Sequence, residues 1–326
     1  MELLPEFVVR HAETLQEAAG LLANDAGARI LAGGTGLVAN MRLGLDAPSL
    51  LVSLDRIEGF REVTDRAGVL RLGAGVTLSR LATDAEVGRR APALAAAAAT
   101  VAGPAHRSAA TLGGNLCLDT RCVFYNQNET WRSSIGYCLK YRGDLCHVAP
   151  RGKRCHAAYS GDLAPVLLVL GAEVEIAGPD GARRATLAAL YRDDGARHLA
   201  LARGEFVAAV LAPAPRPGTR VAYRKARVRG AIDFPLAGVA VALETAHGRV
   251  LDLRVALTGT NPRPLLLEGT GEFRGQAPDQ ALLDKLVKLV QRQASPQRTT
   301  VMSSNYRRQV AAAIARRLVS ELAVPG

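Results

Sequence analysis

The sequence predicts a fold of mixed helices and strands in two domains, and three observations support this. The chain has 326 residues, more than one domain usually holds, and 48% of them are hydrophobic, enough to bury substantial cores. Short apolar strands alternate with helical segments along the chain. The segment 213–220, PAPRPGTR, carries three prolines and indicates a linker. We therefore expect one domain over 1–215 and a smaller one over 216–326.

Residues 6–54 predict a small βαβ unit. Thr14 and Glu17 have the spacing of a capping box, which indicates that a helix begins there. Apolar runs at 29–32 and 49–54 predict two buried strands. The glycine loop between them is expected to lead into a short helix.

The middle of the chain predicts further strands and helices around an irregular segment. Residues 69–83 predict a strand, a Gly-rich turn and a helix, and 91–107 predict an Ala-rich helix that ends at Gly103 and Pro104. After the irregular segment, 161–178 predict a helix and a strand with the break at Gly171, and 198–213 predict two more strands.

The C-terminal part predicts a hairpin followed by two amphipathic helices. The apolar runs 234–244 and 249–259 are expected to pair across the turn at 245–248. Apolar residues then recur at helical spacing within 278–293 and 305–322. The residues expected to face the core are Leu282, Leu286, Leu289, Val310, Ile314, Leu318 and Leu322.

The net charge and the N-terminal sequence limit the classes of function that the protein is expected to have. The net charge is +11, but the arginines are scattered, and the densest groups at 224–229 and 307–317 have no interleaved aromatic residues, which disfavours a nucleic-acid binder. A basic subunit that docks on acidic protein partners is favoured instead. The chain shows no signal-peptide pattern and no apolar run long enough for a membrane span, so we expect a cytoplasmic protein without membrane association.

Two glycine loops are candidate phosphate-binding elements. One is Gly33-Gly34-Thr35-Gly36, and the other runs from Thr111 through Gly113 and Gly114 to Asn115. Such loops offer unblocked backbone N–H groups, and two of them in one domain could clamp a pyrophosphate from both sides. Neither matches the Rossmann fingerprint or the P-loop, and each could also be only a tight turn.

All five cysteines lie between Cys117 and Cys155, together with the single tryptophan. In a reducing compartment, clustered thiols more often bind a metal than pair with each other. The segment lacks a CxxC motif and any regular period, and long irregular loops of this kind are usually functional. The residues leave three readings open: an iron–sulfur cluster, a zinc site that includes His147 or His156, or unrelated free thiols.

Other polar residues carry weaker signals. His11, His106, His198 and His247 are scattered without a telling partner, and no nucleophile or metalloprotease motif is present, so we expect no catalytic residue in this chain. Asp162 stands at a turn before a predicted helix, where a carboxylate usually acts as an N-cap.

Four motifs, in this order, carry a family resemblance: AGGTGL, TLGGNL, GDLAPVLLVLGAEVEI and YRKARVRGAIDFPLAGVAVAL. They resemble the FAD-binding medium subunits of the molybdenum hydroxylases, a family that includes xanthine dehydrogenase and carbon monoxide dehydrogenase. The likeness covers almost the whole chain. Most members lack the cysteine segment. The insertion resembles that of the β subunits of 4-hydroxybenzoyl-CoA reductases, whose extra loop holds a 4Fe–4S cluster.

The resemblance implies an α+β fold and two cofactors. The first domain would be a two-part FAD-binding domain of the vanillyl-alcohol-oxidase type, with a 4Fe–4S loop inserted at about 117–158. The second would be a smaller α+β domain of the type found at the C-terminus of CO dehydrogenase flavoproteins. FAD and a 4Fe–4S cluster are the cofactors implied.

The resemblance also implies residue roles. Thr35 would donate to a phosphate, Val101 would lie near the flavin ring, Asp162 would bind ribityl or adenosine hydroxyls, and Lys225 would approach the flavin. Many relatives carry an acidic residue where Gly36 stands, so only its backbone is expected to contribute. The residues implied for FAD are Arg29, Ile30, Leu31, Ala32, Gly33, Gly34, Thr35, Gly36, Val101, Thr111, Leu112, Gly113, Gly114, Asn115, Asp162 and Lys225. The implied cluster ligands are Cys122, Cys138, Cys146 and Cys155, with Cys117 left over.

The function implied is electron transfer in an oxidoreductase complex. Electrons would pass from ferredoxin through the 4Fe–4S cluster and FAD to a small 2Fe–2S subunit and a large molybdenum-cofactor subunit. There 4-hydroxybenzoyl-CoA would be reductively dehydroxylated, in a dimer of heterotrimers. Two alternatives stay open: a related molybdenum enzyme that acts on another aromatic, and a zinc-stapled binding module without redox function.

Overall fold

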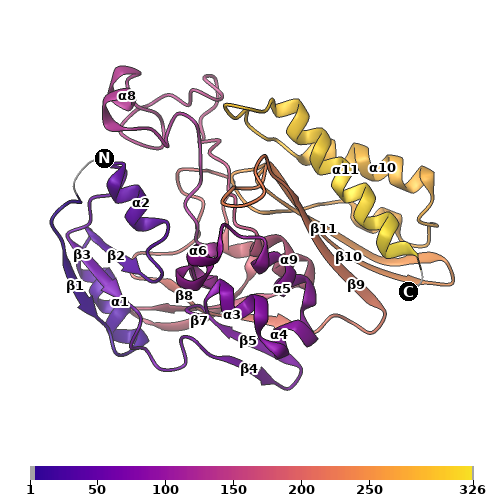
Figure 1. The fold of residues 1–326 in the computed structure, drawn as a ribbon, viewed down its shortest axis with the longest axis horizontal. Coiled ribbons are helices and arrows are strands. Elements are labelled where there is room, and N and C mark those ends of the chain that lie inside the picture. The colour runs from indigo at the N-terminus through magenta and orange to yellow at the C-terminus, as the bar shows by residue number, and fades with distance from the viewer. Residues whose placement is uncertain (1–3, 325–326) are drawn as a thin grey trace.

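The structure is a computed structural model, and it describes residues 4–324. Its N-terminal part is the predicted βαβ unit, in which the sheet order is β1-β3-β2 and both pairs are parallel (Figure 1). Thr14 caps the first helix by accepting from the N–H of Glu17, as predicted, while the Glu17 carboxylate accepts from the N–H of Glu13. The elements are β1 (Val8–His11), α1 (Leu15–Asn24), β2 (Ala28–Leu31), α2 (Leu37–Arg42) and β3 (Leu50–Ser53).

A five-stranded antiparallel sheet follows, with the order β4-β5-β8-β6-β7. Its strands are β4 (Val63–Arg66), β5 (Val69–Gly73), β6 (Glu173–Gly178), β7 (Gly181–Thr186) and β8 (Phe206–Pro213). The central strand β8 is buried over nearly its whole length, which explains its uninterrupted apolar sequence. Of the two strands predicted over 198–213, one is confirmed as β8. The other is wrong, because Gly204 adopts a left-handed φ of 83° and residues 200–205 form a loop.

Short helices cover this sheet. Helix α9 (Leu163–Leu170) is buried at every position and ends, as predicted, at Gly171, which adopts the left-handed conformation. The predicted Ala-rich helix is wrong at its end: α5 (Pro92–Ala99) stops before Gly103, and Pro104 starts a separate helix. The other helices here are α3 (Leu78–Thr83), α4 (Ala85–Arg90), α6 (Pro104–Ala109), α7 (Leu112–Leu116) and the 3-10 helix η1 (Leu187–Leu190).

The C-terminal part is a four-stranded antiparallel sheet with two long helices on one face (Figure 1). The predicted hairpin is confirmed, and its two turn residues, His247 and Gly248, both have positive φ, as a type I′ turn requires. The elements are β9 (Thr219–Ala226), β10 (Ala237–Ala246), β11 (Arg249–Thr258), β12 (Leu265–Leu266), η2 (Thr270–Phe273), α10 (Gln280–Gln293) and α11 (Ser304–Ala323). None of the helices within residues 4–324 combines the length and apolar character that a bilayer crossing requires.

The cysteine segment is an irregular excursion, as its sequence predicts. Within it, the described chain forms one short helix, α8 (Glu129–Ser134), and otherwise turns and isolated bridges. Figure 1 shows α8 on a lobe that projects from the body of the molecule, on the same side as α2.

Arg307 provides a test of how the C-terminal part is held together. Its side chain is 3% exposed and donates to the carbonyl oxygens of Leu236, Gly259 and Gln297, so one guanidinium connects three loops. We expect Arg307→Met to lower the free energy of unfolding by about 3 kcal/mol, because three buried carbonyls lose a charged donor. Urea unfolding of the purified chain measures this loss.

The control for Arg307 is Arg316 on the same helix, whose side chain is 41% exposed and pairs with Asp284. Arg316→Met should change the free energy of unfolding by less than about 1 kcal/mol. Equal losses of unfolding free energy in the two variants would show that the buried guanidinium stabilises the fold no more than the exposed one.

Candidate functional site

A deep cavity of about 920 Å³ lies against the βαβ unit and between the two glycine loops. Its volume is at the upper end of the range for ligand pockets, roughly 300–1,000 Å³, which suits a large extended molecule. Thirteen of the sixteen residues implied for FAD line it; Leu31, Leu112 and Lys225 do not. Those that do are Arg29, Ile30, Ala32, Gly33, Gly34, Thr35, Gly36, Val101, Thr111, Gly113, Gly114, Asn115 and Asp162.

The first glycine loop follows β2 directly and leads into α2. A Cβ on Gly33 would lie 2.0 Å from the carbonyl oxygen of Ala109, so any side chain here would push the loop away from the end of α6. Gly34 has a φ of 68°, which turns the chain back toward the helix. Within the described residues, the N–H groups of Gly33, Gly34, Thr35 and Gly36 donate to no backbone carbonyl. They are available to an anionic ligand.

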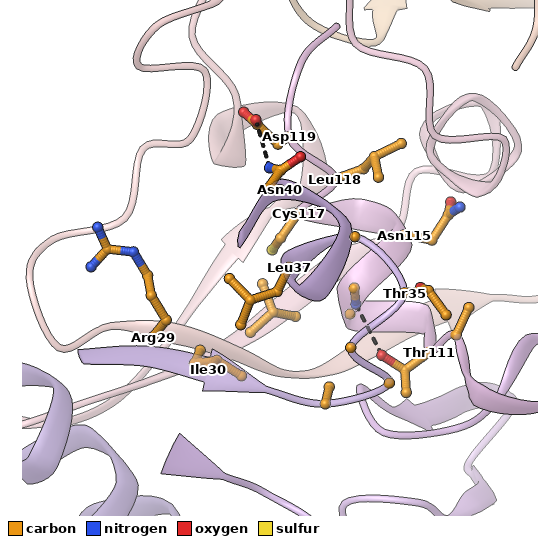
Figure 2. Close-up of a pocket in the computed structure, with 18 of the residues that line it drawn as sticks. Arg29, Ile30, Thr35, Leu37, Asn40, Thr111, Asn115, Cys117, Leu118 and Asp119 are labelled. Atoms are coloured by element: carbon orange, nitrogen blue, oxygen red, sulfur yellow. Dashed lines mark hydrogen bonds between the residues drawn. The ribbon is translucent and has the colours of Figure 1, made fainter. Parts of the chain in front are cut away.

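The second loop is held by both side-chain and backbone hydrogen bonds. Thr111 accepts from the N–H of Gly114 at 3.1 Å, and Gly113 donates its N–H to the carbonyl of Ala74 at 2.8 Å. Asn115 is buried, and its Oδ1 accepts from the N–H of Leu163 at 3.1 Å. Figure 2 shows Thr111 and Asn115 on the side of the cavity where Thr35 lies, whereas Arg29 points away from them. The Thr111 and Asn115 side chains therefore fix the shape of the loop.

Arg29 contributes to the cavity through its backbone more than through its charge. Its guanidinium pairs with Asp46 at 3.1 Å and donates to the carbonyls of Ala26 and Ala28. Burial raises the pKa of Asp46, while the neighbouring Arg29 opposes that shift. Both residues of this pair line the cavity.

Asp162 does not act as the N-cap that its position suggests. Its carboxylate makes no capping bond, since Asn115 takes that role at Leu163. Instead Tyr223 donates its hydroxyl to Oδ1 at 2.6 Å, and the ammonium of Lys225 lies 3.1 Å from the same oxygen. Both charged side chains are almost fully buried, and burial raises the pKa of Asp162 against the opposing effect of Lys225.

Several residues of the cavity wall were missed by sequence reasoning. One group comes from the loop before β8, including Leu199, Leu201 and Arg203, and another from the loop before β10, including Ile232 and Phe234. Both segments are irregular and carry no glycine cluster, so no local signal in the sequence points to them. Their place in the wall depends on how the two sheets pack.

The cysteine segment forms a second, smaller site. Cys122, Cys138, Cys146 and Cys155 line one void, although they come from four separate points of the chain. Three of them are buried, and none of the five cysteines is in a disulfide. Burial raises the pKa of Cys122 to about 11 and that of Cys155 to about 12.

Cys117 and the histidines stand apart from this arrangement. Cys117 lines the large cavity, not the void. His147 lines the void, but its Nε2 donates to the carbonyl of Tyr137 at 2.6 Å, and His156 does not line it. Within residues 4–324, no three His, Cys, Asp or Glu side chains lie close enough together for a single metal ion.

Comparison with known proteins identifies both parts of the chain. Residues 5–215 match the family described as the FAD binding domain in molybdopterin dehydrogenase, and residues 221–322 match the CO dehydrogenase flavoprotein C-terminal domain. The chain is 34% identical to the aldehyde oxidoreductase FAD-binding subunit PaoB of Escherichia coli K12, over 86% of this chain and 89% of that protein. It is 28% identical to the carbon monoxide dehydrogenase medium chain of Afipia carboxidovorans, over 90% and 88%.

Solved structures show the same fold. Reconstituted CO dehydrogenase from Oligotropha carboxidovorans superposes with a TM-score of 0.82 at 24% identity, covering 99% of both chains. Quinoline 2-oxidoreductase from Pseudomonas putida 86 superposes with a TM-score of 0.78 at 25% identity, covering 99% of this chain and 98% of that one. The family match of residues 5–215 shows that the N-terminal domain binds FAD. The solved structures confirm the predicted α+β fold class.

The contact at Gly33 gives a test of the cavity. We expect Gly33→Ala to reduce the FAD that copurifies with the chain at least tenfold, because the added methyl group meets the Ala109 carbonyl and separates the two loops. Fluorescence of FAD released from the denatured protein measures the FAD bound per chain.

Gly20→Ala is the matched control, since a Cβ at this position in α1 meets nothing within 4 Å. This variant should keep the FAD content of the unaltered chain. Full retention of FAD by Gly33→Ala would mean that the approach of the two loops does not shape the binding site.

Proposed function

The chain belongs to the FAD-binding medium subunits of the molybdenum hydroxylase family, and on that premise we propose that it is the electron-transfer subunit of a 4-hydroxybenzoyl-CoA reductase. It would carry FAD and a 4Fe–4S cluster, take electrons from ferredoxin, and deliver them to its partners. Those partners would be a small 2Fe–2S subunit and a large molybdenum-cofactor subunit, assembled as a dimer of heterotrimers. We place the boundary between its two domains at residues 215 and 216, in the turn between β8 and β9.

The large cavity is the proposed FAD site. The free N–H groups of the first glycine loop, with Thr35 beside them, would bind the pyrophosphate from one side, and the second loop would close the other side. Val101 would lie near the flavin ring, and Asp162 would bind hydroxyl groups of the cofactor. Lys225 would act on the cofactor through Asp162, because it lies behind that carboxylate and not in the cavity wall. FAD supplies a carrier that can take up and release electrons one at a time.

The four cysteines around one void are the observation that carries the cluster proposal. Their sulfur atoms share a common space but are too far apart to hold one ion, whereas a zinc ion would draw four thiolates to about 2.3 Å from itself. A 4Fe–4S cluster is larger and takes one thiolate at each of its four irons. With His147 occupied by a carbonyl, the thiols are the remaining soft donors of the void.

Sequence neighbours link the two proposed cofactor sites. Arg121 lines the large cavity, and the next residue, Cys122, lines the cysteine void. Arg121 and Ala158 each donate the backbone N–H to the carbonyl of the other. These two hydrogen bonds join the segments that enter and leave the insertion. Both sites therefore adjoin the same two backbone hydrogen bonds. This keeps the two proposed cofactors close together for electron transfer.

The substrate depends on the partner subunit more than on this chain. Chains of the same fold occur in CO dehydrogenase and in quinoline 2-oxidoreductase, whose names specify very different substrates. The cysteine insertion is what favours the 4-hydroxybenzoyl-CoA branch over another aromatic substrate. A complex copurified through this chain should reduce 4-hydroxybenzoyl-CoA with reduced ferredoxin, and turnover of only another aromatic would replace this assignment.

Metal content of the anaerobically purified chain tests the cluster. We expect about four irons and four sulfides for each FAD, as one 4Fe–4S cluster requires, with flavin bands over a broad absorbance shoulder. Iron, acid-labile sulfide, zinc and FAD are assayed on one sample. Zinc in place of iron would favour the alternative of a zinc-stapled module.

Cysteine variants then locate the cluster. We expect Cys138→Ser to lose most of the iron and sulfide, because the buried Cys138 thiol lines the void. Cys117→Ser is the control and should keep the full iron content, since Cys117 lies at the large cavity. Loss of iron from both variants, or from neither, would contradict the proposed ligand set.

A further inference from the structure

A buried lysine lines the cysteine void. The side chain of Lys140 is 7% exposed, and its ammonium donates to Asp119 Oδ1 at 2.6 Å and to the carbonyl of Thr120 at 2.9 Å. The same nitrogen lies 4.4 Å from the centre of the Tyr125 ring, another residue of the void wall. A lysine is almost never buried without a partner for its charge, so its place here calls for a reason.

Asp119 compensates the charge of Lys140 from the side of the large cavity. Its carboxylate lines the large cavity, where Oδ2 accepts from the side chain of Asn40 at 3.2 Å (Figure 2). Lys140 lines the cysteine void and not the large cavity. The pair thus bridges the two sites, with Lys140 in the wall of the cysteine void and Asp119 in the wall of the proposed FAD site.

The ammonium acts on Cys155, one of the four thiols of the void. Burial raises the pKa of Cys155, and the ammonium of Lys140 opposes this rise. Thr120, which is fully buried, keeps the ammonium in place: its hydroxyl bonds to Lys140 and donates to the carbonyl of Gly195. The charge is therefore held at a fixed position beside the void.

We propose that Lys140, positioned by Asp119 and Thr120, is the charge-compensating residue of the cysteine site and raises the reduction potential of the cluster held there. This inference rests on the proposed function, since it requires the cluster. Four thiolates give such a cluster a net negative charge, and reduction adds one more electron. A nearby fixed cation stabilises the reduced form more than the oxidised form, and so favours electron uptake.

The two members of the pair should shift the potential in opposite directions. Lys140→Gln keeps a hydrogen-bond donor but removes the cation, and should lower the cluster potential. Asp119→Asn removes the compensating anion and should raise it. We expect the ratio of reduced to oxidised cluster at a fixed potential to change about tenfold in each case, which is about 59 mV for a one-electron couple.

The experiment is an anaerobic redox titration of the purified chain, with the cluster followed by electron paramagnetic resonance and the flavin by absorbance. Lys140→Arg should restore a potential close to that of the unaltered chain. Lys153→Gln is the control, because it removes the same charge from an exposed position of the same insertion and should leave the potential unchanged. Iron and sulfide are assayed on every sample.

The outcomes separate the two proposals. An unaltered chain without iron contradicts the cluster itself. A loaded chain in which Lys140→Gln and Asp119→Asn keep the original potential contradicts only the role of Lys140, as would a Lys153→Gln shift as large as that of Lys140→Gln. Should Lys140→Gln fail to assemble a cluster, Asp119→Asn decides, since a shift to a higher potential supports the inference and an unchanged or lower potential overturns it.

Discussion

The large cavity depends on the contact between Gly33 and the carbonyl oxygen of Ala109, where no side chain fits between two backbones. This contact brings the βαβ unit against the end of α6, which leads directly into the second glycine loop. The second loop is fixed in turn, because Gly113 and Leu112 donate their N–H groups to Ala74 and Val76 after β5. The cavity is therefore built mainly by backbone packing. Its side chains shape the loops more than they face the ligand.

The C-terminal domain is joined to this cavity by buried polar contacts. Lys225 and Tyr223 on β9 both bind Asp162 in the cavity wall, and Thr258 donates its hydroxyl to the carbonyl of Gly161 next to it. Burying an ion pair costs desolvation, and the loss of either partner would leave an uncompensated charge. The pair therefore favours one relative placement of the two domains. A cofactor hydroxyl that reached Asp162 would bind to a group already held by both domains.

Local signals in the sequence predicted much of the fold, and tertiary packing decided the rest. The Thr14 cap, the turn at His247 and Gly248, and the end of a helix at Gly171 depend on residues near in sequence, and all three agree with the structure. The segment 199–205 was misread as a strand because its apolar residues face the cavity and not a sheet. Asp162 was misread as a cap because its partners lie about sixty residues away, on a strand that no local pattern links to it. For the same reason the place of Lys225 behind that carboxylate could not be predicted.

The cysteine insertion has little apolar core of its own, so contacts with the main domain must hold it in place. Its small cluster of buried apolar residues consists of Tyr125 and Cys138 packed on Leu45 from the main domain. Arg132, 1% exposed, donates to the carbonyls of Leu43 and Gly44, and the Tyr141 hydroxyl donates to Gly44 as well. These carbonyls directly follow the last residue of α2, and α2 begins directly after the first glycine loop.

Helix α2 is thus a common support for both sites. Its first residue follows the loop that would bind the pyrophosphate, and the carbonyls that follow its last residue hold the insertion. Asn40, within the same helix, reaches Asp119 and through it Lys140 at the cysteine void. A ligand that orders the four thiols would stabilise this polar chain as well, because binding to the folded form alone shifts the equilibrium toward it. The insertion can therefore remain irregular in sequence and still keep a fixed position beside the cavity.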